Sequence, residues 1–248
     1  MREVLVIGIG AGDPDQLTIE AVKALGRLDA AFLVDKGDEK RDLTDLRRQL
    51  LKQYAPGARI VTVSDPPRDR TTSQYPGAVD DWRRKRAAAF ENLIRDELTE
   101  TQRGGFLVWG DPALFDSTIG VLDDIDGVDF GYTVIPGISS VSTLAARHRI
   151  GLNRVGRAVQ ITTGRRLAEQ GLPDDVDDLV VMLDARTAYQ HVSDDVDIYW
   201  GAYLGTPDEI LISGPLSETK DEIDAVRAAA RARKGWIMDT YLLRRRDA

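Results

Sequence analysis

The residues best placed to do chemistry lie at a glycine-rich turn in the middle of the chain. Residues 106–109 form a short apolar run that predicts a buried strand, and Gly110-Asp111-Pro112 follows as a turn that no strand continues through. Asp116 and Ser117 are both good N-caps, so we expect a helix to begin there. Glycine lets a ligand approach the backbone, and free N–H groups at a helix start bind polar oxygens. This stretch therefore predicts a cofactor site.

Two further turns combine glycine with polar residues. Gly8-Ile9-Gly10-Ala11-Gly12-Asp13-Pro14 follows the first apolar run, and Pro136-Gly137-Ile138-Ser139-Ser140 follows the run 130–135 and opens another helix. The first turn does not fit the dinucleotide fingerprint GxGxxG, because Asp13 stands where the third glycine belongs and Pro14 follows at once. We therefore do not expect an NAD site there.

Strands and helices alternate along the first third of the chain, and these elements position the glycine turns. Apolar runs over residues 3–9, 30–34 and 59–63 predict strands. Between them, Thr18 is a plausible N-cap, and the leucines of residues 43–51 mark a second helix. This alternation predicts a mainly parallel sheet. Asp35 lies at the carboxyl end of the second strand, which is where open α/β sheets bind ligands.

The second half of the chain has closely spaced strand candidates that helices separate only in part, which predicts a mixed sheet. We place the domain boundary near residues 133–138, giving an N-terminal domain 1–135 and a C-terminal domain 136–248. The expected strands are 158–162, 179–183, 198–204, 209–213 and 236–243, with helices near 186–191 and 218–233.

Several arginines are candidates for binding an anionic substrate. Residues 80–102 read as a long helix whose start, Arg83 to Arg86, is basic. Cations are unfavourable at the positive end of a helix dipole unless an anion is near. Arginine also suits bidentate binding of carboxylates. The candidates are Arg68, Arg70, Arg83 and Arg86.

The composition excludes several classes of function. The net charge of −8 disfavours non-specific binding of nucleic acid. The absence of cysteine, with only two histidines, argues against a zinc site, so we expect no metal. There is no apolar run of the roughly 18 residues that a membrane span needs, and the first strand begins too early for a signal peptide. We expect a cytoplasmic protein that acts on neither membranes nor nucleic acid.

Four motifs, taken together, resemble the tetrapyrrole methylases, which transfer methyl from S-adenosylmethionine to intermediates of cobalamin and sirohaem biosynthesis. They are the turn 8–14 followed by Leu17-Thr18, Gly110-Asp111-Pro112, the turn 136–140, and Gly205-Thr206-Pro207-Asp208-Glu209. The family's usual glycine-proline-glycine in the first loop is Gly10-Ala11-Gly12 here. The resemblance implies two α/β domains with a cleft between them, in a homodimer.

Within the family, the chain resembles the deacetylating branch, which methylates precorrin-5 at C-1 and releases acetate to give precorrin-6A. Two alternatives stay open, namely methylation of another tetrapyrrole such as uroporphyrinogen III, and a non-catalytic tetrapyrrole-binding module. The stretches that carry the resemblance to the deacetylating branch are 32–37, 64–79, 110–118 and 236–242.

The resemblance also implies site residues. Asp111 would accept hydrogen bonds from the hydroxyl or ammonium groups of S-adenosylmethionine. Loss of acetate requires water to attack an acyl carbonyl, which favours a general base. Asp35 matches a family position that faces the tetrapyrrole, and Asp116 is the other candidate; Asp35 could instead cap its own turn. The implied cofactor contacts are Pro14, Gly110, Asp111, Pro112, Phe115, Ser139, Ser140, Met182, Leu183, Gly205 and Met238.

Overall fold

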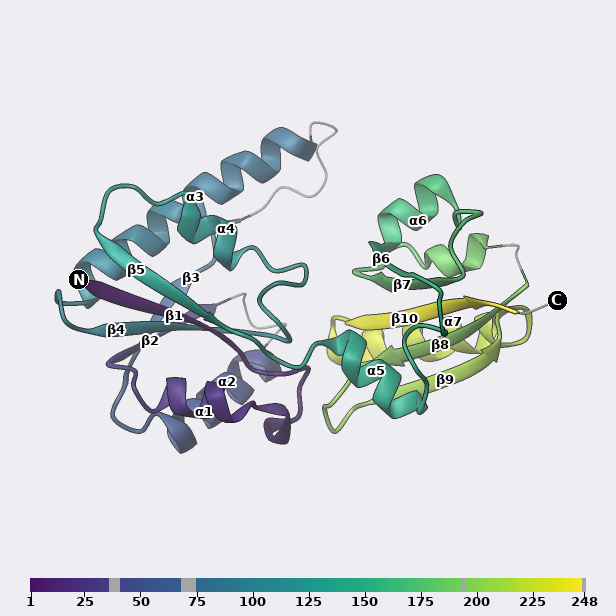
Figure 1. Ribbon diagram of the computed structural model, residues 1–248, viewed down its shortest axis with the longest axis horizontal. Coiled ribbons are helices and arrows are strands. Elements are labelled where there is room, and N and C mark those ends of the chain that lie inside the picture. Colours follow the sequence, from purple (N-terminus) through teal and green to yellow (C-terminus); the bar gives the residue numbers. More distant parts are fainter. Residues whose placement is uncertain (36–40, 68–74, 193–194, 247–248) are drawn as a thin grey trace. The chain divides into compact units, whose positions relative to one another are not determined.

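The chain forms two compact α/β units (Figure 1). The structure, a computed structural model, describes residues 1–35, 41–67, 75–192 and 195–246, and within these ranges it leaves out the side chains of residues 35, 41, 42, 75, 76, 78 and 79. Unit 1 comprises Met1–Gly10 and Pro14–Ile138, and unit 2 comprises Ala11–Asp13 and Ser139–Ala248.

Unit 1 is built on a five-stranded sheet in the order β3-β2-β4-β1-β5. Every pairing in it is parallel, as the alternation of strands and helices predicted. All five strands therefore end at the same edge, which carries the glycine turns after β1, β4 and β5. The strands are β1 (Arg2–Gly8), β2 (Ala30–Asp35), β3 (Arg59–Ser64), β4 (Arg103–Val108) and β5 (Phe130–Ile135).

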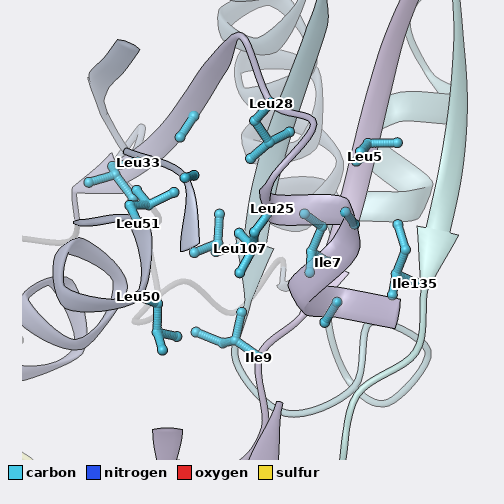
Figure 2. Packing of buried hydrophobic residues seen from close by; sticks show 14 residues of the cluster. Leu5, Ile7, Ile9, Leu25, Leu28, Leu33, Leu50, Leu51, Leu107 and Ile135 are labelled. Carbon is cyan, nitrogen blue, oxygen red and sulfur yellow. The ribbon is translucent and has the colours of Figure 1, made fainter. Parts of the chain in front are cut away.

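Helices cover both faces of this sheet (Figure 1). On one face, α1 (Ile19–Leu25) and α2 (Arg41–Tyr54) bury leucines and isoleucines of β1 and β4 in a continuous apolar cluster (Figure 2). On the other face, α3 (Tyr75–Glu97) and α4 (Thr118–Asp123) contribute to a second cluster, in which the rings of Phe90 and Phe106 stack 4.2 Å apart. A short 3₁₀ helix, η1 (Pro14–Gln16), precedes α1.

The start of α3 differs from the prediction. The helix begins at Tyr75 rather than at Asp80, because proline at position 76 is tolerated in a first helical turn. Arg83 to Arg86 therefore lie inside the helix and not at its positive end. The dipole argument for an anion near them no longer applies, because the dipole acts mainly within the first turn.

Unit 2 has a five-stranded mixed sheet in the order β6-β7-β10-β8-β9. Only the pairing of β6 with β7 is parallel, and β10 runs antiparallel to both β7 and β8. The mixed sheet was predicted from the close spacing of its strands. The strands are β6 (Val159–Thr163), β7 (Asp178–Met182), β8 (Val196–Ala202), β9 (Ile210–Pro215) and β10 (Asp239–Arg245).

One helix of unit 2 was not predicted. Thr163 caps α6 (Gly164–Gln170) by accepting a hydrogen bond from the Arg166 N–H at 3.4 Å. Leu167 is the only large apolar side chain that this helix buries, so its sequence has no apolar stripe. The other helices are α5 (Ser140–His148), η3 (Ala188–His191) and α7 (Leu216–Lys234). None of the helices in the described part of the chain is long and apolar enough to cross a membrane.

Candidate functional site

Three glycines touch one another where β1, β4 and β5 of unit 1 end. A Cβ atom on Gly8 would lie 2.5 Å from the Gly137 nitrogen, and one on Gly137 would overlap the Gly110 carbonyl oxygen. Real Cβ atoms do not approach other atoms this closely, so positions 8 and 137 need glycine for backbone-to-backbone contact. Packing, rather than access for a ligand alone, explains these motif glycines.

The turns after β1 and β4 are also joined by hydrogen bonds. The Gly110 N–H donates to the Gly10 carbonyl at 2.7 Å, and the Gly10 N–H donates back to the Gly110 carbonyl at 3.3 Å. Both residues have positive φ angles, 81° for Gly10 and 72° for Gly110. A side chain at either position would be strained, which fixes glycine here as well.

Asp111 links the turn after β4 to the turn after β5. Its Oδ1 accepts from the Ala113 N–H at 2.8 Å, and its Oδ2 accepts from the Gly137 N–H at 2.9 Å. Both carboxylate oxygens are therefore engaged by the backbone, although each has a second lone pair that could accept from a ligand. Beyond the cofactor contact expected of it, Asp111 holds two turns together.

The residues after this turn present an aromatic ring and a carboxylate. Phe115 has a φ of 52° and is 47% exposed, although aromatic residues rarely adopt this conformation. The exposed Asp116 accepts from the Thr118 N–H at 2.7 Å, which satisfies a free donor at the start of α4. Ser117 stands at the N-cap position but makes no capping bond there; its hydroxyl accepts from Arg86 Nη1 at 2.7 Å.

Arg47, a residue that we did not predict, lies at the same edge. Its Nε donates to the Leu107 carbonyl at 3.0 Å, just before β4 ends, and its Nη1 donates to the Leu43 carbonyl. Burial lowers the pKa of Arg47 to about 10; the charge of Asp116 opposes this change and that of Arg86 adds to it. A signal was present in the sequence, since Arg47 interrupts the leucine face of its helix.

The arginines proposed for substrate carboxylates have partners within unit 1 where the structure describes them. Arg86 is buried, forms an ion pair with Asp65 at 3.3 Å and stacks near two aromatic rings. Arg83 pairs with Asp124 at 2.9 Å. Arg68 and Arg70 lie outside the described residues, as does the side chain of Asp35, whose backbone ends β2.

In unit 2, several expected contact residues start or precede helices and turns. Ser139 caps α5 through its Oγ, which accepts from the Ser142 N–H at 3.2 Å. Ser140 Oγ accepts from the Thr240 hydroxyl at 3.2 Å. Gly205 has a φ of 77°, and its N–H donates to Glu209 Oε2 at 2.7 Å. The Met238 carbonyl accepts from the Tyr203 N–H at 2.9 Å.

The end of β7 carries the remaining pair of expected contacts. Met182 is the last residue of the strand, and Leu183 follows it with a φ of 55° and an exposed fraction of 62%. The next residue, Asp184, is buried. Sequence reasoning missed Asp184, because an aspartate after a strand ordinarily reads as a turn residue.

The expected site residues are thus divided between the two units. In unit 1, Gly110 and Asp111 lie together with Gly137, Pro112 is buried in the same turn, and Pro14 opens η1. Among the residues that the structure describes, no cluster of histidines and carboxylates could hold a metal ion. The groups available to bind a ligand are backbone N–H donors, carboxylates and exposed apolar side chains.

Comparison with known proteins identifies the class of protein that this fold and these turns define. Residues 3–220 match the family model of the tetrapyrrole (corrin/porphyrin) methylases, so the chain belongs to the tetrapyrrole methylase family.

Individual relatives narrow the class further. A precorrin-6A synthase (deacetylating) from Sinorhizobium sp. is 49% identical over 251 residues, covering 99% of this chain and 96% of the relative. The crystal structure of a cobalamin-synthesis-related protein (CobF) from Corynebacterium diphtheriae matches with a TM-score of 0.85 and 38% identity over all of both chains. Uroporphyrin-III C-methyltransferase from Thermus thermophilus, solved with S-adenyl homocysteine, shares the fold at a TM-score of 0.57 and 18% identity over 97% of this chain and 91% of that one.

Proposed function

We propose that this protein transfers a methyl group from S-adenosylmethionine to C-1 of precorrin-5 and releases acetate, giving precorrin-6A. The observation that carries the proposal is the 49% identity, over 99% of the chain, to a precorrin-6A synthase of the deacetylating type. Because the match covers 99% of the chain, it spans both units and the turns described above.

The residues at the strand ends fit a donor of this chemistry. Phe115 and Leu183 expose apolar side chains that suit a flat adenine ring. Asp111 and Asp116 offer carboxylate oxygens for hydroxyl or ammonium groups, which are donors in the ligand. This support is chemical and concerns each unit by itself; the expected cleft and homodimer remain predictions.

The methyl-transfer step requires positioning above all. When bound, S-adenosylmethionine supplies a methyl group on a positively charged sulfur, so the leaving group needs no proton. The protein's part is to hold donor and acceptor in line, which in suitable cases supplies roughly 7–11 kcal/mol of the barrier reduction. The Gly10–Gly110 hydrogen bonds and the Asp111 link give the turns of unit 1 the rigidity that such positioning needs.

Asp111→Ala tests the role of that link. We expect the affinity for S-adenosylhomocysteine to fall at least about tenfold, because the turns after β4 and β5 lose their connection. We also expect unfolding to become easier by about 1–3 kcal/mol, since the Ala113 and Gly137 N–H groups lose their partner. Titration calorimetry and urea unfolding measure the two effects. Asp123→Ala, which removes an exposed carboxylate bonded to Tyr132, is the control and should preserve affinity. Unchanged affinity in Asp111→Ala would refute the role.

Acetate release needs a base, for which we propose Asp35. Water's oxygen bonds to the acetyl carbon, the base takes a proton of that water, and the bond from the acetyl carbon to the macrocycle breaks, so that acetate leaves. The electron pair of the broken bond stays on the macrocycle carbon and is available to bond the methyl group of the donor, whose methyl–sulfur pair stays on sulfur. Asp35→Asn should keep the affinity for S-adenosylhomocysteine and lower turnover about 100-fold or more, which is a common contribution of a general base. Rates of acetate formation measure this effect. Asp116→Asn is the matched variant. If turnover falls in Asp116→Asn and not in Asp35→Asn, the general base is Asp116.

Product analysis tests the function as a whole. With precorrin-5 and S-adenosylmethionine, we expect one acetate and one S-adenosylhomocysteine for each methylated product. Calorimetry with S-adenosylhomocysteine should show one site per chain, and no binding at millimolar ligand would refute the proposal. Methylation of uroporphyrinogen III without acetate would indicate the alternative substrate. Tetrapyrrole binding without turnover would indicate a non-catalytic module.

A further inference from the structure

The loop after β7 has an unusual backbone. Between Met182 and η3, both Leu183 and Thr187 have positive φ angles, 55° and 50°, although neither is a glycine. The conformation costs free energy for both residues, and more for the β-branched Thr187. Leu183 also exposes 62% of its surface to water. Such a loop persists only if its surroundings hold it in place.

Asp184 is the group that holds it. Its Oδ2 accepts from the Tyr241 hydroxyl and from the Ala188 N–H, each at 2.7 Å, and its Oδ1 accepts from the Arg186 N–H at 2.9 Å. The side chain is 3% exposed. Gly164 makes room for it, since a Cβ atom there would overlap the carboxylate.

A second layer of buried residues fixes the same loop from the sheet. Arg227 Nη2 donates to the Asp184 carbonyl, and its Nε donates to Asp239 Oδ2 at 3.0 Å. Burial, with the nearby charge of Asp184, raises the pKa of Tyr241 well above its ordinary value. Tyr241 therefore stays protonated and donates to Asp184 at every working pH.

We propose that Asp184 is a positioning residue that holds Leu183 in its strained, exposed conformation, so that Leu183 presents its side chain and backbone to the adenine of the methyl donor. The inference rests on the proposed function. Strained residues that their surroundings hold in place are concentrated at ligand contacts, and Leu183 is such a residue: it is exposed and apolar, and it precedes a buried carboxylate with three hydrogen bonds. The position suits a ligand because it follows the carboxyl end of β7.

Two matched variants test the proposal. Asp178 stands at the other end of β7, is also fully buried, and pairs with Arg244 at 2.6 Å and Arg154 at 3.4 Å. Asp184→Asn and Asp178→Asn should both lower the stability of the protein. Only Asp184→Asn should raise the Kd for S-adenosylhomocysteine, by about tenfold (about 1.4 kcal/mol). It should raise KM for the donor and leave kcat and KM for the tetrapyrrole unchanged.

A third variant keeps the test decisive if Asp184→Asn fails to fold. Leu183→Ala removes an exposed side chain, so it should weaken binding of S-adenosylhomocysteine about tenfold without lowering stability. Wild-type affinity in Leu183→Ala, or equal losses in Asp184→Asn and Asp178→Asn, would overturn the inference while leaving the proposed function standing. A folded wild-type protein that does not bind S-adenosylhomocysteine would overturn both.

Discussion

Gly137→Ala is expected to cost about 3 kcal/mol of folding free energy and to abolish measurable binding of the methyl donor. The new methyl group would overlap the Gly110 carbonyl oxygen and lie 2.8 Å from the Gly8 Cα atom. Both contacts are with backbone, which cannot move aside as a flexible side chain can. The turns after β1 and β4 would separate from the turn after β5, and the Asp111–Gly137 hydrogen bond would break. Urea unfolding and calorimetry with S-adenosylhomocysteine measure the two losses.

Gly57→Ala is the control for this substitution. A Cβ atom at Gly57, between α2 and β3, has no atom within 4 Å. The same added methyl group should therefore leave donor affinity unchanged, and it should stabilise the fold slightly, by about 0.4–1 kcal/mol, if alanine accepts the local backbone. A Gly137→Ala protein that has wild-type stability and wild-type donor affinity would contradict the claim that position 137 requires glycine.

Arg227→Met is expected to destabilise the protein by about 3–5 kcal/mol, the usual cost of removing one partner of a buried ion pair. Arg227 and Asp239 are 7% and 6% exposed and lie 3.0 Å apart. Burial raises the pKa of Asp239, although the charge of Arg227 opposes the change. Without Arg227, the Asp239 carboxylate keeps, among the residues that the structure describes, only its bond from Trp200 Nε1 at 3.1 Å. Urea unfolding at several pH values measures the loss.

The pH dependence of that loss has a defined sign. Burial gives the Asp239 carboxyl group a higher pKa in the folded protein than in the unfolded chain. Such a group stabilises the fold at a pH below its pKa in the unfolded chain, and this contribution is lost as the pH rises through its pKa in the folded protein. The loss of stability in Arg227→Met should therefore be largest near neutral pH, and it should shrink as the pH falls toward 3.8, the ordinary pKa of aspartate. Arg227→Met/Asp239→Asn should recover part of the deficit, because no charge is left unpaired. A deficit independent of pH would contradict this account.

Much of the fold was predictable because an apolar run of strand length, bounded by turn residues, can be recognised in the sequence. The strands of unit 1 lie at the apolar runs that predicted them, although β4 begins at Arg103 and not at Phe106. Thr18 caps α1 as expected, accepting from the Ala21 N–H at 3.0 Å. Features that depend on few residues were missed. The helix α6 has a single large buried side chain, and the first turn of α3 contains a proline that reads locally as loop.

The candidate site was predictable in part for a related reason. Glycine turns leave a local signature, so the turns at Gly10, Gly110 and Gly137 could be found from sequence. Hydrogen bonds between residues that are distant in the sequence leave no such local signature. The Asp184 carboxylate is bonded by Tyr241, 57 residues away, and Asp111 is bonded by the Gly137 N–H, 26 residues away. The roles of such residues become visible only when the strands are assembled.

The division of the chain has a practical consequence for dissecting the protein. Residues Ala11–Asp13 belong to unit 2, although both flanking segments belong to unit 1. Within unit 2, Asp13 lies 3.7 Å from Arg147, which also pairs with Glu209 at 3.0 Å. A fragment expressed from Ser139 onward would lack this tripeptide, leaving Arg147 without one of its acidic neighbours. Dividing the chain at a single position therefore cannot give two fragments that each contain a complete unit.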